Sequence, residues 1–294
     1  MISTSLVRLA VVAGVVTPLA LWTMAGARAE QAQQAAASEV AIDSDDIGGI
    51  VRSANGPEAG VWVIAETREL GVRYIKSVVT DDQGRFVVPD LPPAEYSVWA
   101  RGYGLVDSAK TPSRPGRHVN ITATVAPTPA AAAEYYPAIY WYSMLKIPTD
   151  AEFQSRDGIA ANQTKQSWLG SMKNVGCIGC HQIGQKSTRT IPEMFRTFPT
   201  SAEAWLRRVQ SGQSGQQMYS ALVGLGPAAA RNLGDWTDRI ARGELPHATP
   251  PRPTGVERNI VVTLRDWMTD RHYLHDLISS DRRNPTVNAN GPLY

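Results

Sequence analysis

Hydrophobic and polar positions alternate with a period of two along the first half of the chain, from Gly48 to Val125. Short runs rich in β-branched and aromatic residues are separated by turn-forming residues, a pattern that predicts strands. The expected strands are Gly49–Val51, Gly60–Ala65, Tyr74–Thr80, Arg85–Val88, Tyr96–Arg101 and His118–Val125. Gly84 ends the turn Asp81–Gly84 and is expected to take a positive φ in a hairpin. This spacing of strands and turns predicts a compact antiparallel β-sandwich.

A helical period replaces this alternation in the second half of the chain. Apolar residues recur at intervals of three and four in three stretches, which predicts three helices with one buried face each. The stretches begin near Thr164, Thr200 and Pro227, and their inward residues are Trp168, Leu169 and Met172, then Ala202, Trp205, Leu206 and Val209, then Ala229, Leu233, Trp236 and Ile240. An all-α domain this small has little core of its own, so a bound group is expected to supply much of it.

The first 29 residues have the three parts of a secretory signal peptide: Arg8, the apolar run Leu9–Val16 and the A-x-A sequence Ala27–Ala29. The run is short for a spanning helix, so cleavage is expected rather than a membrane anchor. Contact with the membrane would arise only through an uncleaved signal. The mature protein is therefore predicted to be periplasmic or secreted.

Two Pro-rich linkers divide the mature chain. Pro127–Ala133 follows the predicted sandwich, and the aromatic segment Tyr135–Leu145 is expected to pack as a strap between two domains. Pro246–Pro253 precedes Val256–Trp267, which is expected to form one strand. The predicted organisation is a signal peptide at 1–29, an independently folding β-sandwich at 47–126, a linker and strap at 127–159, a helical domain at 160–243 and a Pro-rich linker with an incomplete β tail at 244–294.

Both cysteines of the chain lie in the pentad Cys177-Ile178-Gly179-Cys180-His181. C-x-x-C-H is the sequence that attaches haem c covalently. Positions i, i+3 and i+4 share a helix face, so Cys177 and Cys180 can both reach the porphyrin vinyl groups while His181 turns toward the iron. The sequence therefore predicts one covalent haem c with His181 as the proximal iron ligand. Export agrees with this, because bacteria attach haem c outside the cytoplasm.

Zinc sites and dithiol redox sites also use paired cysteines. A zinc site needs further ligands, and the remaining histidines, His118, His247, His272 and His275, are distant from the pentad in sequence. A thioredoxin-like dithiol opens a helix after a strand in a βαβ unit, and the sequence before Cys177 predicts no such unit. The residues favour haem over both alternatives.

The order helix, C-x-x-C-H, Pro-containing loop, helix, methionine in a Gly-rich stretch and closing helix resembles a class I cytochrome c over residues 160–243. The resemblance implies that the Pro192 carbonyl accepts the Nδ1 hydrogen of His181 and fixes its tautomer. It also implies that Met218, after the Gly-rich stretch Ser211–Gln217, is the distal iron ligand. Unlike in many members of the family, no proline follows Met218 directly. The alternatives are Met194, His247, His272 or an open position.

The runs Gly60–Val63, Thr80–Phe86 and Leu91–Val98 resemble a carboxypeptidase regulatory-like domain, a transthyretin-like β-sandwich grouped with carbohydrate-binding-like folds. The resemblance implies that Gly84, Phe86 and Tyr96 form turns and core. Alternation favours Trp62 and Trp99 in the sandwich core, and a sugar-stacking surface is the other interpretation. The tail resembles the start of the β-propeller in exported proteins related to virginiamycin B lyase, which would make the chain a fragment of a longer protein.

Charge is divided unevenly along the chain. Residues 1–29 hold two arginines and no acid, so the mature chain carries 27 bases and 27 acids and gives no argument for nucleic-acid binding. Residues 30–133 hold 13 acids and 9 bases, net −4, whereas residues 164–243 hold 10 bases and 4 acids, net +6. The positive segment is expected either to dock an acidic redox partner or to use arginines such as Arg207 and Arg208 to neutralise haem propionates.

These observations lead to one principal hypothesis, an exported mono-haem c-type cytochrome that carries single electrons and has a β-sandwich as adaptor or binding module. One alternative is a carbohydrate- or surface-binding module with an accessory haem. Another is the electron-transfer front end of a larger propeller oxidoreductase or lyase-like protein. No Ser/His/Asp order, Gly-rich phosphate loop or paired-carboxylate motif stands out, so the chain is not expected to be an enzyme by itself.

Overall fold

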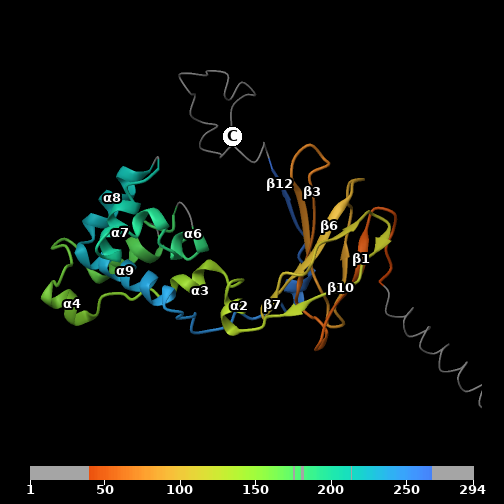
Figure 1. Cartoon of the computed structure of the whole chain (residues 1–294), viewed down its shortest axis with the longest axis horizontal. Helices are drawn as coiled ribbons and strands as arrows, with labels where there is room; N and C mark the ends of the chain where they lie inside the picture. Colours follow the sequence, from red (N-terminus) through yellow and green to blue (C-terminus); the bar gives the residue numbers. More distant parts are fainter. Residues whose placement is uncertain (1–39, 175, 180–181, 213, 267–294) are drawn as a thin grey trace, which may run out of the picture. The chain divides into compact units, whose positions relative to one another are not determined.

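The structure is a computed structural model that describes residues 40–174, 176–179, 182–212 and 214–266. The predicted signal peptide lies outside the described residues. Several β-sheets form in the first half of the described chain and helices follow (Figure 1), which confirms the predicted order of the two classes of element. Below, "β-region" means residues 42–126 with residues 252–266, and "helical region" means residues 127–245.

The first sheet is built around strand β1 (Ile47–Ser53). Strands β2 (Gly56–Pro57) and β5 (Arg85–Val88) pair with β1 antiparallel, whereas β9 (Arg117–His118) and β10 (Ile121–Thr122) pair with it parallel. Gly49 allows β1 to lie close to the segment between β9 and β10, because a Cβ at Gly49 would lie 1.9 Å from the Val119 carbonyl oxygen. The prediction of one strand over His118–Val125 is wrong, since β11 (Thr124–Val125) leaves this sheet and pairs with β7 (Leu105–Val106).

The second sheet has the order β12-β4-β3-β6-β8, and all its pairs are antiparallel. Its strands are β3 (Trp62–Thr67), β4 (Tyr74–Val79), β6 (Tyr96–Arg101), β8 (Thr111–Ser113) and β12 (Val262–Arg265). Buried and half-buried residues alternate along β4, β5 and most of β6, as the period of two predicted. Both sheets contribute to one core, with Val51, Phe86 and Val88 from the first and Val63, Tyr96 and Val98 from the second. This packing is compatible with a sandwich.

The turn Asp81–Gly84 has the expected geometry. Gly84 has φ +74°, and a Cβ there would lie 2.5 Å from the Val51 carbonyl oxygen. Asp81 Oδ1 accepts hydrogen bonds from the backbone nitrogens of Gln83 and Arg85, at 2.9 and 2.8 Å. The predicted turn and core roles of Gly84, Phe86 and Tyr96 agree with these positions.

Alternation favoured Trp62 and Trp99 in the sandwich core, but the structure does not place them there. Each is half-buried, while their strand neighbours Val63 and Val98 are fully buried. The period of two is obeyed, but these two indoles lie on its outer side. Trp62 packs edge-on to Tyr103 at 5.0 Å between ring centroids, and the Trp99 Nε1 donates to Glu66 Oε1 at 3.1 Å.

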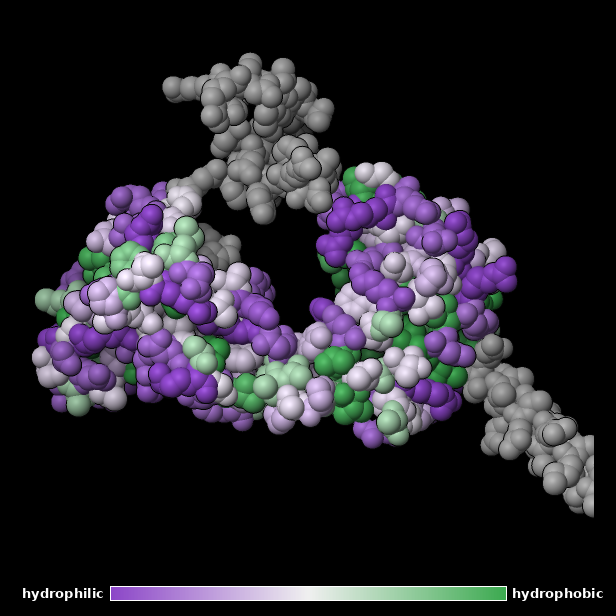
Figure 2. Space-filling model, in the orientation of Figure 1, coloured by the Kyte–Doolittle hydropathy of each residue, from purple (hydrophilic) through white to green (hydrophobic). Residues whose placement is uncertain are grey.

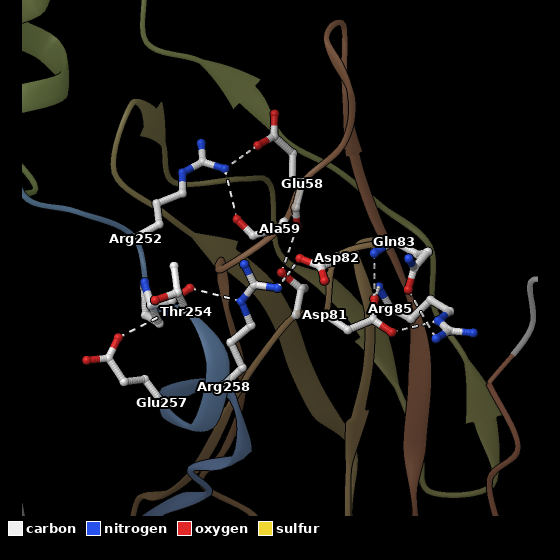
Figure 3. Close-up of polar contacts among 12 residues, drawn as sticks. Glu58, Ala59, Asp81, Asp82, Gln83, Arg85, Arg252, Thr254, Glu257 and Arg258 are labelled. Atoms are coloured by element: carbon white, nitrogen blue, oxygen red, sulfur yellow. Dashed lines mark hydrogen bonds and ion pairs between the residues drawn. The ribbon is translucent and has the colours of Figure 1, made fainter.

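The segment after the helical region returns to the β-region. The sequence predicted one strand over Val256–Trp267 at the entrance to a further domain; instead a 3-10 helix, η3 (Gly255–Asn259), precedes β12, which pairs antiparallel with β4. A lone strand is unstable, and here the edge of β4 supplies the partner. Arg252 and Arg258 reach back to Glu58 and Asp82 (Figure 3). The question of a domain beyond Asp266 falls outside the described residues.

The helical region begins inside the predicted linker and strap. Its elements are α2 (Pro129–Ala133), α3 (Ala138–Tyr142), α4 (Asp150–Ser155), α5 (Lys165–Leu169) continuing into the π-helical turn η1 (Gly170–Asn174), α6 (Lys186–Arg189), the 3-10 turn η2 (Glu193–Phe195), α7 (Ser201–Arg208), α8 (Gly215–Gly224) and α9 (Pro227–Ala241). Thr200 caps α7 by accepting from Glu203 N, as its capping spacing predicted. None of the described helices has the length and apolar content needed to cross a bilayer.

Aromatic residues fill the core of the helical region. Trp141 and Tyr142 come from the predicted strap, and Trp168, Trp205 and Trp236 come from the three predicted helices. Helices α7 and α9 approach closely at Gly234, where a Cβ would lie 2.8 Å from Ala202 N. The strap also touches the β-region, since the Tyr136 ring lies 6.0 Å edge-on from Tyr103. The aromatic segment is therefore mainly core of the helical region.

Candidate functional site

The first three pentad residues, Cys177, Ile178 and Gly179, form a turn directly after η1. Cys180 and His181 lie outside the described residues. The Cys177 backbone nitrogen donates to Ser171 O at 2.8 Å. Gly176 makes this turn possible, because a Cβ there would lie 2.4 Å from the same Ser171 oxygen. The close return of the chain thus holds Cys177 against the helix that precedes it.

Cys177 faces the aromatic core. Its Sγ lies 3.8 Å from the Sδ of the fully buried Met172. Burial raises the pKa of the Cys177 thiol. Among the described residues, the only group of three side chains able to share a metal ion is the distant set Asp43, Asp45 and Asp46.

Tyr142 fixes the helical turn before the pentad. Its hydroxyl is buried and donates to the Met172 carbonyl oxygen, and its ring packs edge-on to Trp236 at 5.9 Å. Burial, with the nearby Cys177 thiol, raises the pKa of Tyr142 well above its usual range. Lys173 lies over the same ring and donates to Tyr142 O at 3.1 Å, and burial lowers the pKa of this lysine. These contacts fix the turn η1, which precedes Cys177, against Tyr142.

Two arginines fix the loop that follows the pentad. Arg189 is buried, stacks on Trp141 with 4.1 Å between its Cζ and the ring centroid, and donates to Gly184 O at 3.1 Å and to Glu134 Oε2 at 2.9 Å. Burial lowers the pKa of Arg189, and Glu134 only partly offsets this effect. The loop is therefore tied to the strap before it reaches Pro192.

Arg208 holds the same loop from helix α7. Its guanidinium donates to the carbonyl oxygens of Thr188 at 3.1 Å, Thr190 at 2.9 Å and Ser187. Burial lowers the pKa of Arg208. Arg207 is exposed and donates to Ser211 Oγ at 3.2 Å. The sequence suggested both arginines as partners of haem propionates; the structure commits Arg208 to backbone carbonyls instead.

Pro192 and the candidate distal methionines lie beyond this loop. Pro192 precedes η2 and its carbonyl accepts from Phe195 N at 2.9 Å, which leaves the second lone pair for another donor. Met218 lies in helix α8 rather than in an extended Gly-rich stretch, on the same face as the buried Gly215 and Leu222. Met194 is 72% exposed, and His247 is exposed.

Half-buried apolar residues are relevant to whether this site could hold a large apolar group. Cys177 and Ile178 of the pentad, and Ile191, Leu206 and Val209 of the loop and helix that follow, pack on the helical core yet stay only half-buried. Trp168 is fully buried one helical turn before Met172, and its Nε1 has no hydrogen-bond partner. A macrocycle bound at the pentad would cover Cys177 and Ile178. The half-buried apolar residues are compatible with such a group, and the enclosed Trp168 nitrogen does not bear on it.

The positive charge of the helical region is smaller than its sequence suggested. Six of the ten bases counted between residues 164 and 243 form ion pairs, namely Lys165, Lys186, Arg189, Arg196, Arg231 and Arg239. Four of the acids that pair with them lie outside that range, and residues 134–244 hold 12 bases and 9 acids. Hydrophilic residues cover most of the visible face of the helical region (Figure 2). A net charge of +3 gives weaker steering of an acidic partner than +6.

Comparison of the chain with protein-family models and with curated proteins found no match.

Proposed function

We propose that the chain is an exported c-type cytochrome that carries one covalent haem and transfers single electrons. The observation that carries this proposal is the single C-x-x-C-H pentad, whose Cys177 is half-buried and packs on an aromatic helical core. Cys177 and Cys180 would form the two thioethers and His181 would bind the iron on one side. Haem c supplies a one-electron change at iron when bound.

The chain's own residues would position and shield that group. Tyr142 and Lys173 hold the turn that carries Cys177, and Arg189 and Arg208 hold the loop that leads to Pro192. Ile178, which follows Cys177 and is half-buried on the same core, would help to exclude water from the porphyrin. A rigid, dry site of this kind favours electron transfer, because little has to reorganise when the charge changes. The redox partner is proposed to be a protein, and the small net positive charge favours an acidic one.

The test is the spectrum and electrophoresis of the mature protein, made in a strain that attaches haem c. The wild type should retain haem on a denaturing gel and show the absorption bands of reduced haem c. The double variant Cys177→Ala/Cys180→Ala should retain none, whereas Trp99→Ala, a substitution in the β-region, should retain it fully. A wild type without covalent haem would overturn the proposal.

A second candidate role belongs to the β-region, which resembles a carboxypeptidase regulatory-like domain. The half-buried indole of Trp99 lies on the outer side of its strand, flanked by Arg101 at 4.9 Å and Lys110 at 5.5 Å from the ring centroid. Such a site favours binding of a carbohydrate or another surface ligand. Titration with neutral and acidic oligosaccharides should change tryptophan fluorescence in the wild type and not in Trp99→Ala. No response to either kind of sugar would leave the β-region as an adaptor.

A further inference from the structure

The β-region carries a groove of about 580 Å³. It is lined by all residues of β8 and β9, together with Glu95, Arg114, Val119 and Asn120. Among the described strands, β8 pairs only with β6 and β9 only with β1, so the groove is bordered by one edge strand from each sheet. Its size is in the range of sites that hold a small ligand. The β-region therefore has a candidate ligand site that the proposed haem does not use.

The charge of this groove is opposite to that of the chain around it. Residues 30–133 have a net charge of −4, yet the lining holds two arginines, Arg114 and Arg117, and one acid, Glu95. Glu95 lies 3.4 Å from Arg114, and both side chains are more than half exposed, so this ion pair is weak. No carboxylate in the described part of the chain pairs with Arg117. The groove therefore favours an anionic ligand.

Neutral hydrogen-bond donors accompany the two arginines. Asn120 Oδ1 accepts from Ile50 N at 3.2 Å, which leaves the amide NH₂ of Asn120 as a donor. The Ser113 hydroxyl lies 3.5 Å from the Arg114 carbonyl oxygen, at the outer limit of a hydrogen bond, so it is also available. A phosphate group has three strong acceptor oxygens, whereas a carboxylate has two. Guanidinium, amide and hydroxyl donors together therefore suit a phosphate group better.

Two other classes of ligand suit this groove less well. No tryptophan, tyrosine or phenylalanine lines it, so it lacks the ring on which a neutral sugar would stack. Pro112 in the middle of β8 has no backbone N–H and interrupts the edge that a peptide strand would join. Recognition of an anion by side chains fits the groove better than sugar stacking or strand addition.

We infer that this groove binds a phosphate-bearing ligand through the guanidinium groups of Arg114 and Arg117. Such a site goes beyond the proposed function and does not depend on haem. The planar guanidinium presents paired N–H donors that match two oxygens of one phosphate group. Arg114 also lines a neighbouring groove, where Asp45 and Asp90 would repel an anion. The phosphate group is therefore assigned to the groove that Arg117 lines as well.

The first measurement is calorimetric titration of the full mature protein with inorganic pyrophosphate at low salt. The wild type should bind, and Arg117→Gln should bind about tenfold more weakly, because a charge-assisted hydrogen bond is lost. Arg52→Gln is the matched control, because Arg52 is an exposed arginine of β1 that does not line the groove. Both arginines are exposed, so neither variant should change the Tm. A wild type that does not bind, or equal weakening in the two variants, would overturn the inference.

The second measurement identifies the source of the phosphate group, which can be a soluble ester or a lipid headgroup. Glycerol 3-phosphate is the soluble probe, and vesicles of phosphatidylglycerol in phosphatidylcholine are the headgroup probe. Binding of glycerol 3-phosphate that is weaker in Arg117→Gln but not in Arg52→Gln would support a soluble ester. The same pattern with the vesicles alone would support a headgroup. If neither probe binds, or if both variants bind each probe alike, overall charge explains the pyrophosphate result and the inference fails.

Discussion

Arg252 Nη1 lies 2.5 Å from Glu58 Oε2, and this ion pair joins the segment after the helical region to the connection between β2 and β3 (Figure 3). The Glu58 side chain is only 7% exposed. The same guanidinium donates to Ala59 O at 3.2 Å and to Tyr103 O at 2.8 Å. Segments far apart in sequence therefore form one β-region, in which β12 is the edge strand of the second sheet.

Replacing Arg252 should destabilise the β-region. Arg252→Ala leaves the nearly buried Glu58 carboxylate and two carbonyls without their donor, which we expect to cost about 2–4 kcal/mol. Arg258→Ala is the matched control, because its partner Asp82 is 76% exposed and such pairs contribute under about 1 kcal/mol. Urea unfolding followed by circular dichroism measures both. Equal losses in the two variants would show that burial of Glu58 does not decide the effect.

The sequence predicted the strands of the β-region better than their partners. Alternation located β4, β5 and β6, because each has one buried and one outer face, and it located β3 although Ile64 on its outer side is buried as well. It did not show that β12 would pair with β4, since pairing between distant segments leaves no local pattern. For the same reason, the indoles of Trp62 and Trp99 satisfied the period of two and were still assigned to the wrong side.

Glu66 should make the β-region sensitive to acid. Burial alone would raise its pKa, but Lys110, Arg73 and the Trp99 indole all donate to this carboxylate and hold the pKa below its ordinary value of 4.5. A depressed folded pKa means that the stabilisation is complete above the unfolded pKa and is lost as pH falls through the folded pKa. Wild-type stability should therefore fall below about pH 4.5.

Glu66→Gln tests this pH dependence. The variant should lose about 1–2 kcal/mol at neutral pH, since a neutral amide replaces a charged acceptor. It should then lose less than the wild type between about pH 7 and about pH 3. Glu95→Gln is the control, because Glu95 forms an exposed 3.4 Å pair with Arg114. Parallel acid profiles for wild type and Glu66→Gln would contradict the assignment.

Arg208 should stabilise the loop between the pentad and Pro192. Arg208→Ala removes the donors to the carbonyls of Ser187, Thr188 and Thr190, with an expected cost of about 2–3 kcal/mol. Arg207→Ala, on the exposed side of the same helix, should cost under about 0.5 kcal/mol. Urea unfolding gives the stabilities, and limited proteolysis should cut the loop faster only in Arg208→Ala. A loop that stays resistant in this variant would show that Arg189 suffices.

The site shows where a sequence is informative and where it is not. The pentad is a local motif, so its chemistry can be predicted from five adjacent residues. Arg207 and Arg208 are neighbours with the same side chain, yet one is exposed and the other is bound to three carbonyls. Their environments differ because the loop between the pentad and Pro192 passes beside Arg208 and not beside Arg207. Trp168 was correctly placed on the inner face of its helix, but an unsatisfied hydrogen bond depends on every neighbour and has no signature in sequence.

The distal iron ligand decides whether the proposed haem serves electron transfer or binds small molecules. Met218 lies 37 residues after His181 and before the closing helix α9. It is half-buried on the face of α8 that also carries Leu222, a residue of the helical core. Met194 is 72% exposed, so it would have to turn inward to reach an iron in the core.

Histidine–methionine ligation gives a higher reduction potential than bis-histidine ligation and suits an electron carrier. The oxidised wild type should therefore show the weak charge-transfer band near the red edge of the spectrum that this ligand pair produces. Met218→Ala should lose the band and lower the potential, because the thioether is replaced by water or a stronger donor. Met194→Ala should keep both, since the side chain removed is exposed. If the band survives Met218→Ala and disappears in Met194→Ala, the loop after Pro192 must supply the ligand, and the turn η2 would have to open when haem is attached.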